Sequence, residues 1–267
     1  MLKLRQSVFH IVLLIALSAS VLCQTPREIE NELLSHFKKL EQASNYGGSR
    51  NENVQELENK TIRSIFFKYG RRTDVLKFSF SKLREKIFIS TSKDGRLRTY
   101  SWDDEGGGTM HNFYTAYQYR GRSGKVHIKL TPFLVDISEQ GVGTFYHDIF
   151  QTDTTDGPIY ILVSSGIFST PLSGQFINTA KINGERFEIV RAIRTTKGLT
   201  DIITFEYNFF SVVNHPERPV KLVFYDKKTK SFRFPVVIED KNDPGEGRVT
   251  DKFITYRFNG RYFVKVS

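Results

Sequence analysis

The sequence predicts a mainly β protein, in which an antiparallel meander, sandwich or barrel-like sheet follows two N-terminal amphipathic helices. Three observations predict this fold class. Apolar residues recur at helical spacing only before about residue 70. Short alternating runs of aromatic and β-branched residues follow from there to the end of the chain. Glycine-containing turn pairs separate several of these runs, as they do in hairpins.

Residues 1–23 have the pattern of a secretory signal peptide. Two basic residues precede an apolar run over residues 8–17, and small residues follow it. The run is shorter than the roughly 20 apolar residues that a membrane-spanning helix needs. The pattern allows cleavage after Ser20 or after Cys23. We therefore expect an exported chain that begins near Gln24 and resides in the periplasm or outside the cell.

A lipid anchor on Cys23 is the alternative for the N-terminus. A lipoprotein is cut just before a cysteine, but the preceding residue should be small and here it is Leu22, which disfavours lipidation. No cysteine follows Cys23, so the mature chain has no disulfide, thiolate metal site or cysteine nucleophile. No later run reaches 18 apolar residues, and we expect no transmembrane segment in the mature chain.

The N-terminal segment, residues 24–70, is expected to be helical. Thr25 as N-cap, Pro26 at the first helical position and Glu28 two residues later form a capping box that begins a helix over residues 25–44. A second amphipathic stretch, residues 53–67, predicts the second helix.

Residues 71–267 are expected to form one antiparallel β domain, because turn residues punctuate the alternating runs about every ten positions. Asp94-Gly95, Asn183-Gly184 and Asn259-Gly260 predict type I′ hairpin turns with positive φ at both central residues. Longer hairpins are expected at 121–124 and 225–232, and long loops at 151–158 and 239–248. The expected strands are 75–81, 86–91, 97–102, 110–120, 125–131, 143–150, 159–164, 186–193, 202–210, 220–225, 231–238, 252–258 and 262–266.

The mature chain is basic. Removing residues 1–23 takes away Lys3 and Arg5 and no acid, which leaves 37 basic and 29 acidic side chains and a net charge of +8. A basic exported protein favours an anionic envelope polymer, a glycan or another exported protein as its partner, and the compartment excludes nucleic acid. The charges of both signs are interspersed, so a basic solvated surface without a partner is the alternative.

An acidic, glycine-rich stretch follows Trp102. Asp103, Asp104 and Glu105 stand beside three glycines, and such a segment can offer oxygen ligands to a calcium ion on a backbone that bends sharply. The spacing of an EF-hand loop is absent, and a flexible acidic turn between two strands explains the same residues. We therefore expect no metal and no cofactor.

Aromatic residues flanked by arginines occur around this stretch. Aromatic rings beside polar groups suit sugar rings or a protein hot spot, so the segment predicts an exposed binding platform. Strands with apolar residues on both faces are also typical of a core, which is the alternative. The platform would consist of Tyr100, Trp102, Tyr117, Tyr119, Arg120 and Arg122.

His111, His147 and Asp148 are the candidate acid–base residues. No pair of histidines has the spacing of a zinc site on a strand. His147 and Asp148 are adjacent, which on a regular strand directs their side chains to opposite faces. Ser165 follows a predicted strand, but the Gly-x-Ser-x-Gly elbow of a serine hydrolase is absent.

These observations favour an exported, non-enzymatic binding or structural protein of the cell envelope. One alternative is a hydrolase that acts on an envelope glycan or ester, and another is an inhibitor or partner of a second exported protein. The hydrolase hypothesis requires His111 and His147 to lie in one cleft and to share a carboxylate such as Asp103 or Asp148.

Overall fold

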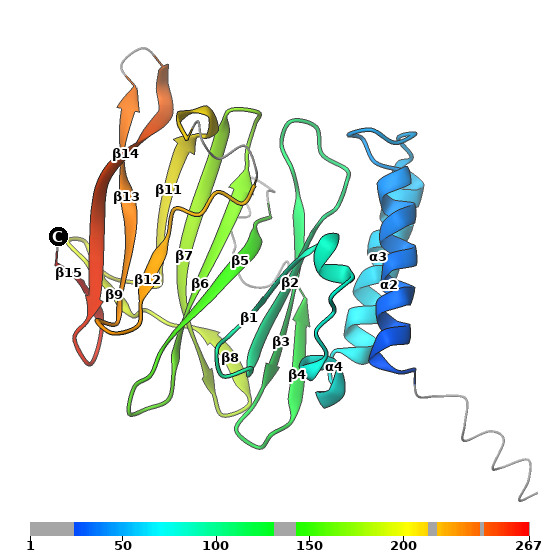
Figure 1. The fold of residues 1–267 in the computed structure, drawn as a ribbon, viewed down its shortest axis with the longest axis horizontal. Coiled ribbons are helices and arrows are strands. Elements are labelled where there is room, and N and C mark those ends of the chain that lie inside the picture. The colour runs from blue at the N-terminus through cyan, green and yellow to red at the C-terminus, as the bar shows by residue number, and fades with distance from the viewer. Residues whose placement is uncertain (1–23, 131–142, 213–217, 241–242, 267) are drawn as a thin grey trace, which may run out of the picture.

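The computed structural model describes residues 24–130, 143–212, 218–240 and 243–266, and it stacks them in four layers (Figure 1). From right to left in Figure 1 these are a pair of helices, a first sheet (sheet A, β1–β4), a second sheet (sheet B, β5–β8 and β11) and a third sheet (sheet C, β9, β10 and β12–β15). The predicted signal peptide, including Cys23, lies outside the described residues. The predicted mainly β fold is confirmed.

The two predicted N-terminal helices are α2 (Pro26–Gln42) and α3 (Glu52–Tyr69). The Thr25 capping box forms as predicted, with reciprocal hydrogen bonds between Thr25 and Glu28. Two short helical turns follow, α4 (Thr73–Lys77) and η1 (Leu83–Glu85). The predicted strand at 75–81 is therefore wrong, because a helical turn buries its apolar residues Val75 and Leu76 in the core.

Sheet A lies between the helices and sheet B and is buried on both faces. One face packs against the helices, with Tyr100 and Trp102 in that core, and the other packs against sheet B through Leu97 and Tyr117. Its four strands are antiparallel in the order β1-β2-β3-β4. They are β1 (Phe88–Thr91), β2 (Leu97–Asp103), β3 (Phe113–Arg120) and β4 (Val126–Leu130).

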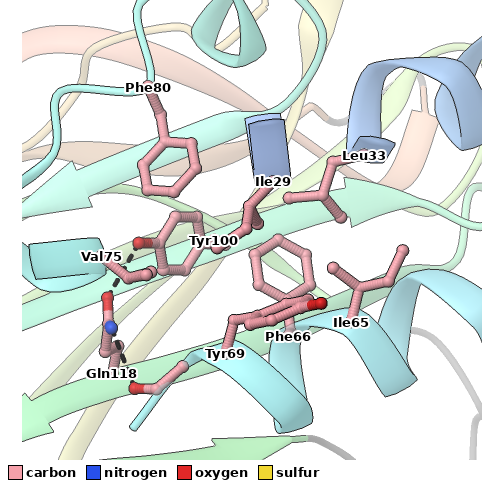
Figure 2. Close-up of a pocket in the computed structure, with 10 residues that line it drawn as sticks. Ile29, Leu33, Ile65, Phe66, Tyr69, Val75, Phe80, Tyr100 and Gln118 are labelled. Carbon is pink, nitrogen blue, oxygen red and sulfur yellow. Dashed lines mark hydrogen bonds between the residues drawn. The ribbon is translucent and has the colours of Figure 1, made fainter. Parts of the chain in front are cut away.

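Figure 2 shows a small cavity in the core between the helices and sheet A. Its volume is about 10 Å³, close to the smallest space that holds one water molecule. The Tyr100 hydroxyl donates to Gln118 Oε1 at 2.8 Å, and Gln118 Nε2 donates to the carbonyl of Gly70 at 2.9 Å. The cavity is too small for an organic ligand, and the hydrogen bonds satisfy the polar atoms at its edge.

Sheet B is the central β layer, and its order is β11-β7-β6-β5 with β8 paired to β7. The sequence did not predict β7, although it is the partner of both β6 and β11. The polar residues of β7, such as Gln175 and Asn178, are buried and interrupt the apolar alternation that signals a strand. The strands are β5 (Phe145–Thr152), β6 (Ile159–Ile167), β7 (Leu172–Asn183), β8 (Arg186–Ile189) and β11 (Ile202–Asn208).

Sheet C is the outermost layer, in the order β10-β9-β15-β14-β13-β12. All its pairs are antiparallel except the parallel pair β15 and β9. Its inner face forms a core with sheet B that includes Ile161, Val163, Phe232 and Tyr256. The described strands of all three sheets remain open and do not close into a barrel. The strands are β9 (Ile193–Thr195), β10 (Gly198–Thr200), β12 (Phe224–Asp226), β13 (Ser231–Asp240), β14 (Asp243–Phe258) and β15 (Phe263–Lys265).

The predicted hairpins form at all five places, and the loop at 151–158 lies between β5 and β6. The predicted type I′ geometry is wrong. In each turn pair only the glycine has a positive φ, +66° at Gly95, +58° at Gly184 and +102° at Gly260. The predicted loop at 239–248 is also wrong, because β13 extends to Asp240 and β14 begins at Asp243.

Glu185, in the β7–β8 turn, connects sheet B to the β3–β4 turn of sheet A. It accepts hydrogen bonds from the Ser123 backbone amide (2.8 Å) and lies 2.8 Å from His127 Nε2. These two hydrogen bonds, the amide first, lower the pKa of Glu185 from 4.5 to about 2. A carboxyl whose pKa is lower in the folded chain stabilises the fold above its unfolded pKa, and this contribution disappears as the pH falls through the folded value.

We expect Glu185→Gln to remove stability at pH 7 and to flatten the loss of stability between about pH 4.5 and pH 2. Thermal unfolding of both chains over this pH range measures the effect. Asp156→Asn, at an exposed site in the β5–β6 loop, is the matched control and should keep the wild-type pH profile. Parallel pH profiles for Glu185→Gln and wild type would contradict the role assigned to Glu185.

Candidate functional site

The predicted aromatic platform is not a surface. Its four aromatic side chains lie inside the hydrophobic cores on the two faces of sheet A, so none of them can stack on a ligand. Sheet A is covered on one side by the helices and on the other by sheet B, which is the physical reason for the error. The four are at most 4% exposed: Tyr100, Trp102, Tyr117 and Tyr119.

The two arginines of that platform lie at the β3–β4 turn, away from the buried rings. Arg120 is half-buried and Arg122 is exposed. The Arg120 carbonyl accepts from the Arg96 side chain at 3.2 Å, and the Arg122 backbone amide donates to the Gly184 carbonyl at 2.8 Å. These contacts hold the turn in place, and no aromatic ring of the proposed platform joins the arginines at the surface.

The acidic stretch forms a fixed loop between β2 and β3. Gln55 Nε2 donates to the Glu105 carbonyl at 3.0 Å, and Asn59 Nδ2 donates to the Asp104 carbonyl at 2.9 Å, so α3 holds the loop backbone. Ser44 donates to the Glu105 carboxylate at 2.5 Å. The expected flexible turn is thus anchored to the helical layer at several points.

Burial is the main cause that raises the pKa values of Asp104 and Glu105. The Asp104 carboxylate accepts from the backbone amide of Gly106 at 2.9 Å, and that of Asp103 lies against His111. Within the described residues, no group of three or more His, Cys, Asp or Glu side chains is arranged to hold a metal ion.

His111 and His147 do not share a carboxylate. His111 Nδ1 lies 2.5 Å from Asp103 and its ring stacks on Tyr46 at 4.3 Å, whereas His147 Nδ1 lies 3.1 Å from Asp148. A row of contacting rings separates the two histidines, from His111 through Phe113 and Phe145 to His147. The predicted set of His111, His147 and Asp148 is therefore not assembled as one acid–base unit.

The expected separation of His147 and Asp148 is wrong. A β-bulge between Tyr146 and Asp148 interrupts the pairing of β5 with β6 and makes His147 an extra residue on the strand. The bulge breaks the alternation of faces, so adjacent side chains come into contact. The other ring nitrogen, His147 Nε2, lies 3.0 Å from the Ser165 hydroxyl on β6.

A groove of about 760 Å³ lies beside α3. Basic and acidic side chains are mixed along it, together with the rings of Tyr114 and Phe67, so its charge favours no ligand of one sign. Its charged lining residues are Glu52, Glu56, Lys60, Arg63 and Asp104.

The outer face of sheet C carries a more uniform set of side chains. In the part of the chain that the structure describes, sheet C has a core on one side only, so residues that alternate with buried ones point outward. Arg233 lies between the buried Phe232 and Phe234, and Arg257 follows the buried Tyr256. We call this surface the arginine face, and it consists of Arg194, Phe224, Arg233, Phe253 and Arg257, all of them exposed.

Aromatic rings hold two of the three guanidinium groups of this face. The Arg233 guanidinium lies 5.6 Å from the ring centre of Phe224 and 4.8 Å from that of Phe253. The Arg194 guanidinium lies 5.1 Å from the ring centre of Tyr262. Stacking on a ring restrains a guanidinium and leaves its N–H edge available to an anion.

The strand register spaces these arginines regularly. Arg257, Val264 and Arg194 are register partners across β14, β15 and β9. Two strands are separated by about 5 Å, so Arg257 and Arg194 lie roughly 10 Å apart. Arg257 pairs with Ser231 on the neighbouring strand β13, and Arg233 lies two residues after Ser231 on that strand. The face thus presents a row of positive charges across four strands.

Among the residues whose side chains are described, none forms an ion pair with these three arginines. The nearby acid Asp226 is at the end of β12 and accepts from the backbone amide of Lys228 at 2.8 Å. The three guanidinium groups of the arginine face therefore carry positive charge that no described carboxylate pairs with.

This face was not predicted from the sequence, although the sequence contains a signal for it. The segments 232–234 and 256–258 each place an arginine between two aromatic residues, which on a strand with one buried face predicts an outward arginine. The pattern does not reveal that the two arginines lie on adjacent strands, because this depends on the strand order.

Comparison with protein-family models, with curated proteins and with solved structures finds no match to this chain. Within the described residues, no helix is both long and apolar enough to cross a membrane.

Proposed function

We propose that this chain is an exported binding protein that holds an anionic polymer of the cell envelope on the arginine face. The observation that carries the proposal is the row of three exposed arginines, two of them restrained by aromatic rings and none with an ion-pair partner among the described side chains. The signal-peptide pattern supports the envelope as the compartment, and the net charge of +8 favours an anionic partner.

The geometry suits an acidic polysaccharide better than a compact anion. Guanidinium groups recognise carboxylate or sulfate groups by paired hydrogen bonds. A row that extends roughly 15 Å across four strands matches several charges along a chain rather than one ion. Phe224 and Phe253 add apolar faces beside Arg233, on which sugar rings can pack.

We expect the exported chain to bind dextran sulfate with an affinity that falls as salt rises, and not to bind uncharged dextran. Arg194→Gln, Arg233→Gln and Arg257→Gln combined should weaken binding at least 10-fold. Each exposed ion pair contributes about 0.5–1 kcal/mol to the binding free energy. The sum of three such pairs exceeds the roughly 1.4 kcal/mol that corresponds to a 10-fold change in Kd. Isothermal titration calorimetry at two salt concentrations measures these values.

A matched triple variant separates the arginine face from net charge alone. Arg122→Gln, Lys125→Gln and Arg186→Gln remove the same charge from exposed positions near the β3–β4 and β7–β8 turns. This variant should bind dextran sulfate within about 2-fold of wild type. An equal loss in both triple variants would contradict a site on the arginine face, and so would binding to phosphatidylglycerol vesicles without binding to dextran sulfate.

A further inference from the structure

A polar chain of contacts lies inside sheet B, close to the end where β6 turns into β7. Asp148 Oδ2 lies 3.1 Å from His147 Nδ1, and His147 Nε2 lies 3.0 Å from Ser165 Oγ. Gln175 Nε2, on the opposite strand β7, lies 3.2 Å from the same Ser165 oxygen. A serine hydroxyl, an imidazole and a carboxylate are thus connected in the order that activates a serine nucleophile.

The hydrogen-bond directions along this chain are consistent with that chemistry. Gln175 donates one N–H to the Val220 carbonyl at 2.7 Å and the other to Ser165 Oγ, so the Ser165 hydroxyl is left to donate to His147 Nε2. The other His147 nitrogen then donates to the Asp148 carboxylate. Asp148 is a positioning residue in this arrangement because it holds the tautomer in which His147 can accept the serine proton.

Two further buried polar groups lie beside this chain of contacts, both on β7. Gln175 is fully buried, and the hydroxyl of Ser173, two positions before it, is 2% exposed. The side chain of Tyr207 on β11 interacts with both of them. The polar contacts therefore continue from Ser165 towards β11.

The bulge at His147 is the structural device that creates this chain. Without it, His147 and Asp148 would face opposite sides of β5, and the imidazole would not reach both Asp148 and Ser165. Bulges that re-aim a side chain occur frequently beside active sites. The chain of contacts is mostly buried and reaches solvent at Asp148: the side chain of Asp148 is 24% exposed, that of His147 is 4% exposed and Ser165 is 5% exposed.

We propose that Ser165 is a nucleophile that His147 activates and that it accepts a small acyl group from an ester. The Ser165 oxygen bonds to the ester carbonyl carbon as its proton passes to His147 Nε2. The bond from that carbon to the alkoxide then breaks, and the alcohol leaves with this proton. Water attacks the acyl-serine, again through His147, and releases the acid and free Ser165. This inference goes beyond the proposed polymer binding and does not rest on it.

The test uses diisopropyl fluorophosphate, a small reagent that forms a phosphorus–oxygen bond to an activated serine and releases fluoride. Mass spectrometry of the folded, exported chain should show one adduct, mapped to Ser165. Ser165→Ala should abolish it. Ser164→Ala is the matched control, because Ser164 is an equally buried neighbour on the other face of β6, and it should retain the adduct.

His147→Gln should slow labelling of Ser165 by about 100-fold or more, since a general base contributes at least that factor. Circular dichroism confirms that each variant is folded. Mapping the adduct in the wild-type chain tests the proposal even if a variant does not fold. An unlabelled Ser165 in folded wild type would overturn the proposal and leave the chain of contacts as a structural network. Labelling that is independent of His147 would overturn it as well.

Discussion

Trp102→Ala should destabilise the fold by about 3–5 kcal/mol, the range for removing a fully buried large aromatic side chain. Trp102 is 1% exposed and contacts rings from three elements, Phe37 on α2, Phe66 on α3 and Tyr114 on β3. Its indole N–H also donates to Asn59 Oδ1 at 3.0 Å. The substitution therefore removes the side chain that joins both helices to sheet A and leaves a buried amide oxygen without its donor.

Urea unfolding followed by circular dichroism measures this loss. Trp102→Phe is the matched control, because it retains an aromatic ring in the core and loses the hydrogen bond to Asn59. We expect it to cost roughly 1–3 kcal/mol, the penalty for an unsatisfied buried polar group. A Trp102→Ala chain with wild-type stability would show that the helices do not depend on this core.

Phe232→Ala should destabilise the fold by a similar amount, about 3–5 kcal/mol, on the opposite side of the molecule. Phe232 is fully buried between sheets B and C and contacts the rings of Tyr256 at 5.5 Å and Phe263 at 5.2 Å. The cavity left by its removal lies between sheets B and C and reduces the packing of sheet C on sheet B.

Phe224→Ala is the control for this substitution. Phe224 is 42% exposed on the neighbouring strand β12, and its loss should change the unfolding free energy by less than about 1 kcal/mol. The same urea titration reports both values. Equal effects of Phe224→Ala and Phe232→Ala would contradict the division of sheet C into an inner and an outer face.

Local patterns predicted the elements whose signals are contained in a few neighbouring residues. The capping box at Thr25 predicted α2, and the Asn183-Gly184 pair predicted the hairpin that joins β7 to β8. The strand β7 itself was missed, because its buried residues include Gln175, Asn178 and Thr179 and leave no alternation of apolar and polar positions. Their burial results from the stacking of three sheets.

Site residues were harder to predict, because their exposure and their neighbours depend on how the layers stack and on the order of the strands. Tyr100 and Tyr117 are of a residue type that is typical of binding surfaces. Only the position of sheet A between two other layers shows that both are buried. The contact between His147 and Asp148 depends on one bulge in β5, and the sequence gives no sign of it. The arginines of sheet C come together through strand order in the same way.

Chemical modification of arginine tests the proposed function most directly. Phenylglyoxal modification of the chain that begins at Gln24, mapped by mass spectrometry with and without dextran sulfate, reports which guanidinium groups the polymer covers. We predict that the polymer slows modification of Arg194, Arg233 and Arg257 and leaves Arg122 and Arg186 unchanged. If the polymer instead protects Arg122 and Arg186 and leaves the arginines of sheet C unprotected, this result contradicts a binding site on the arginine face.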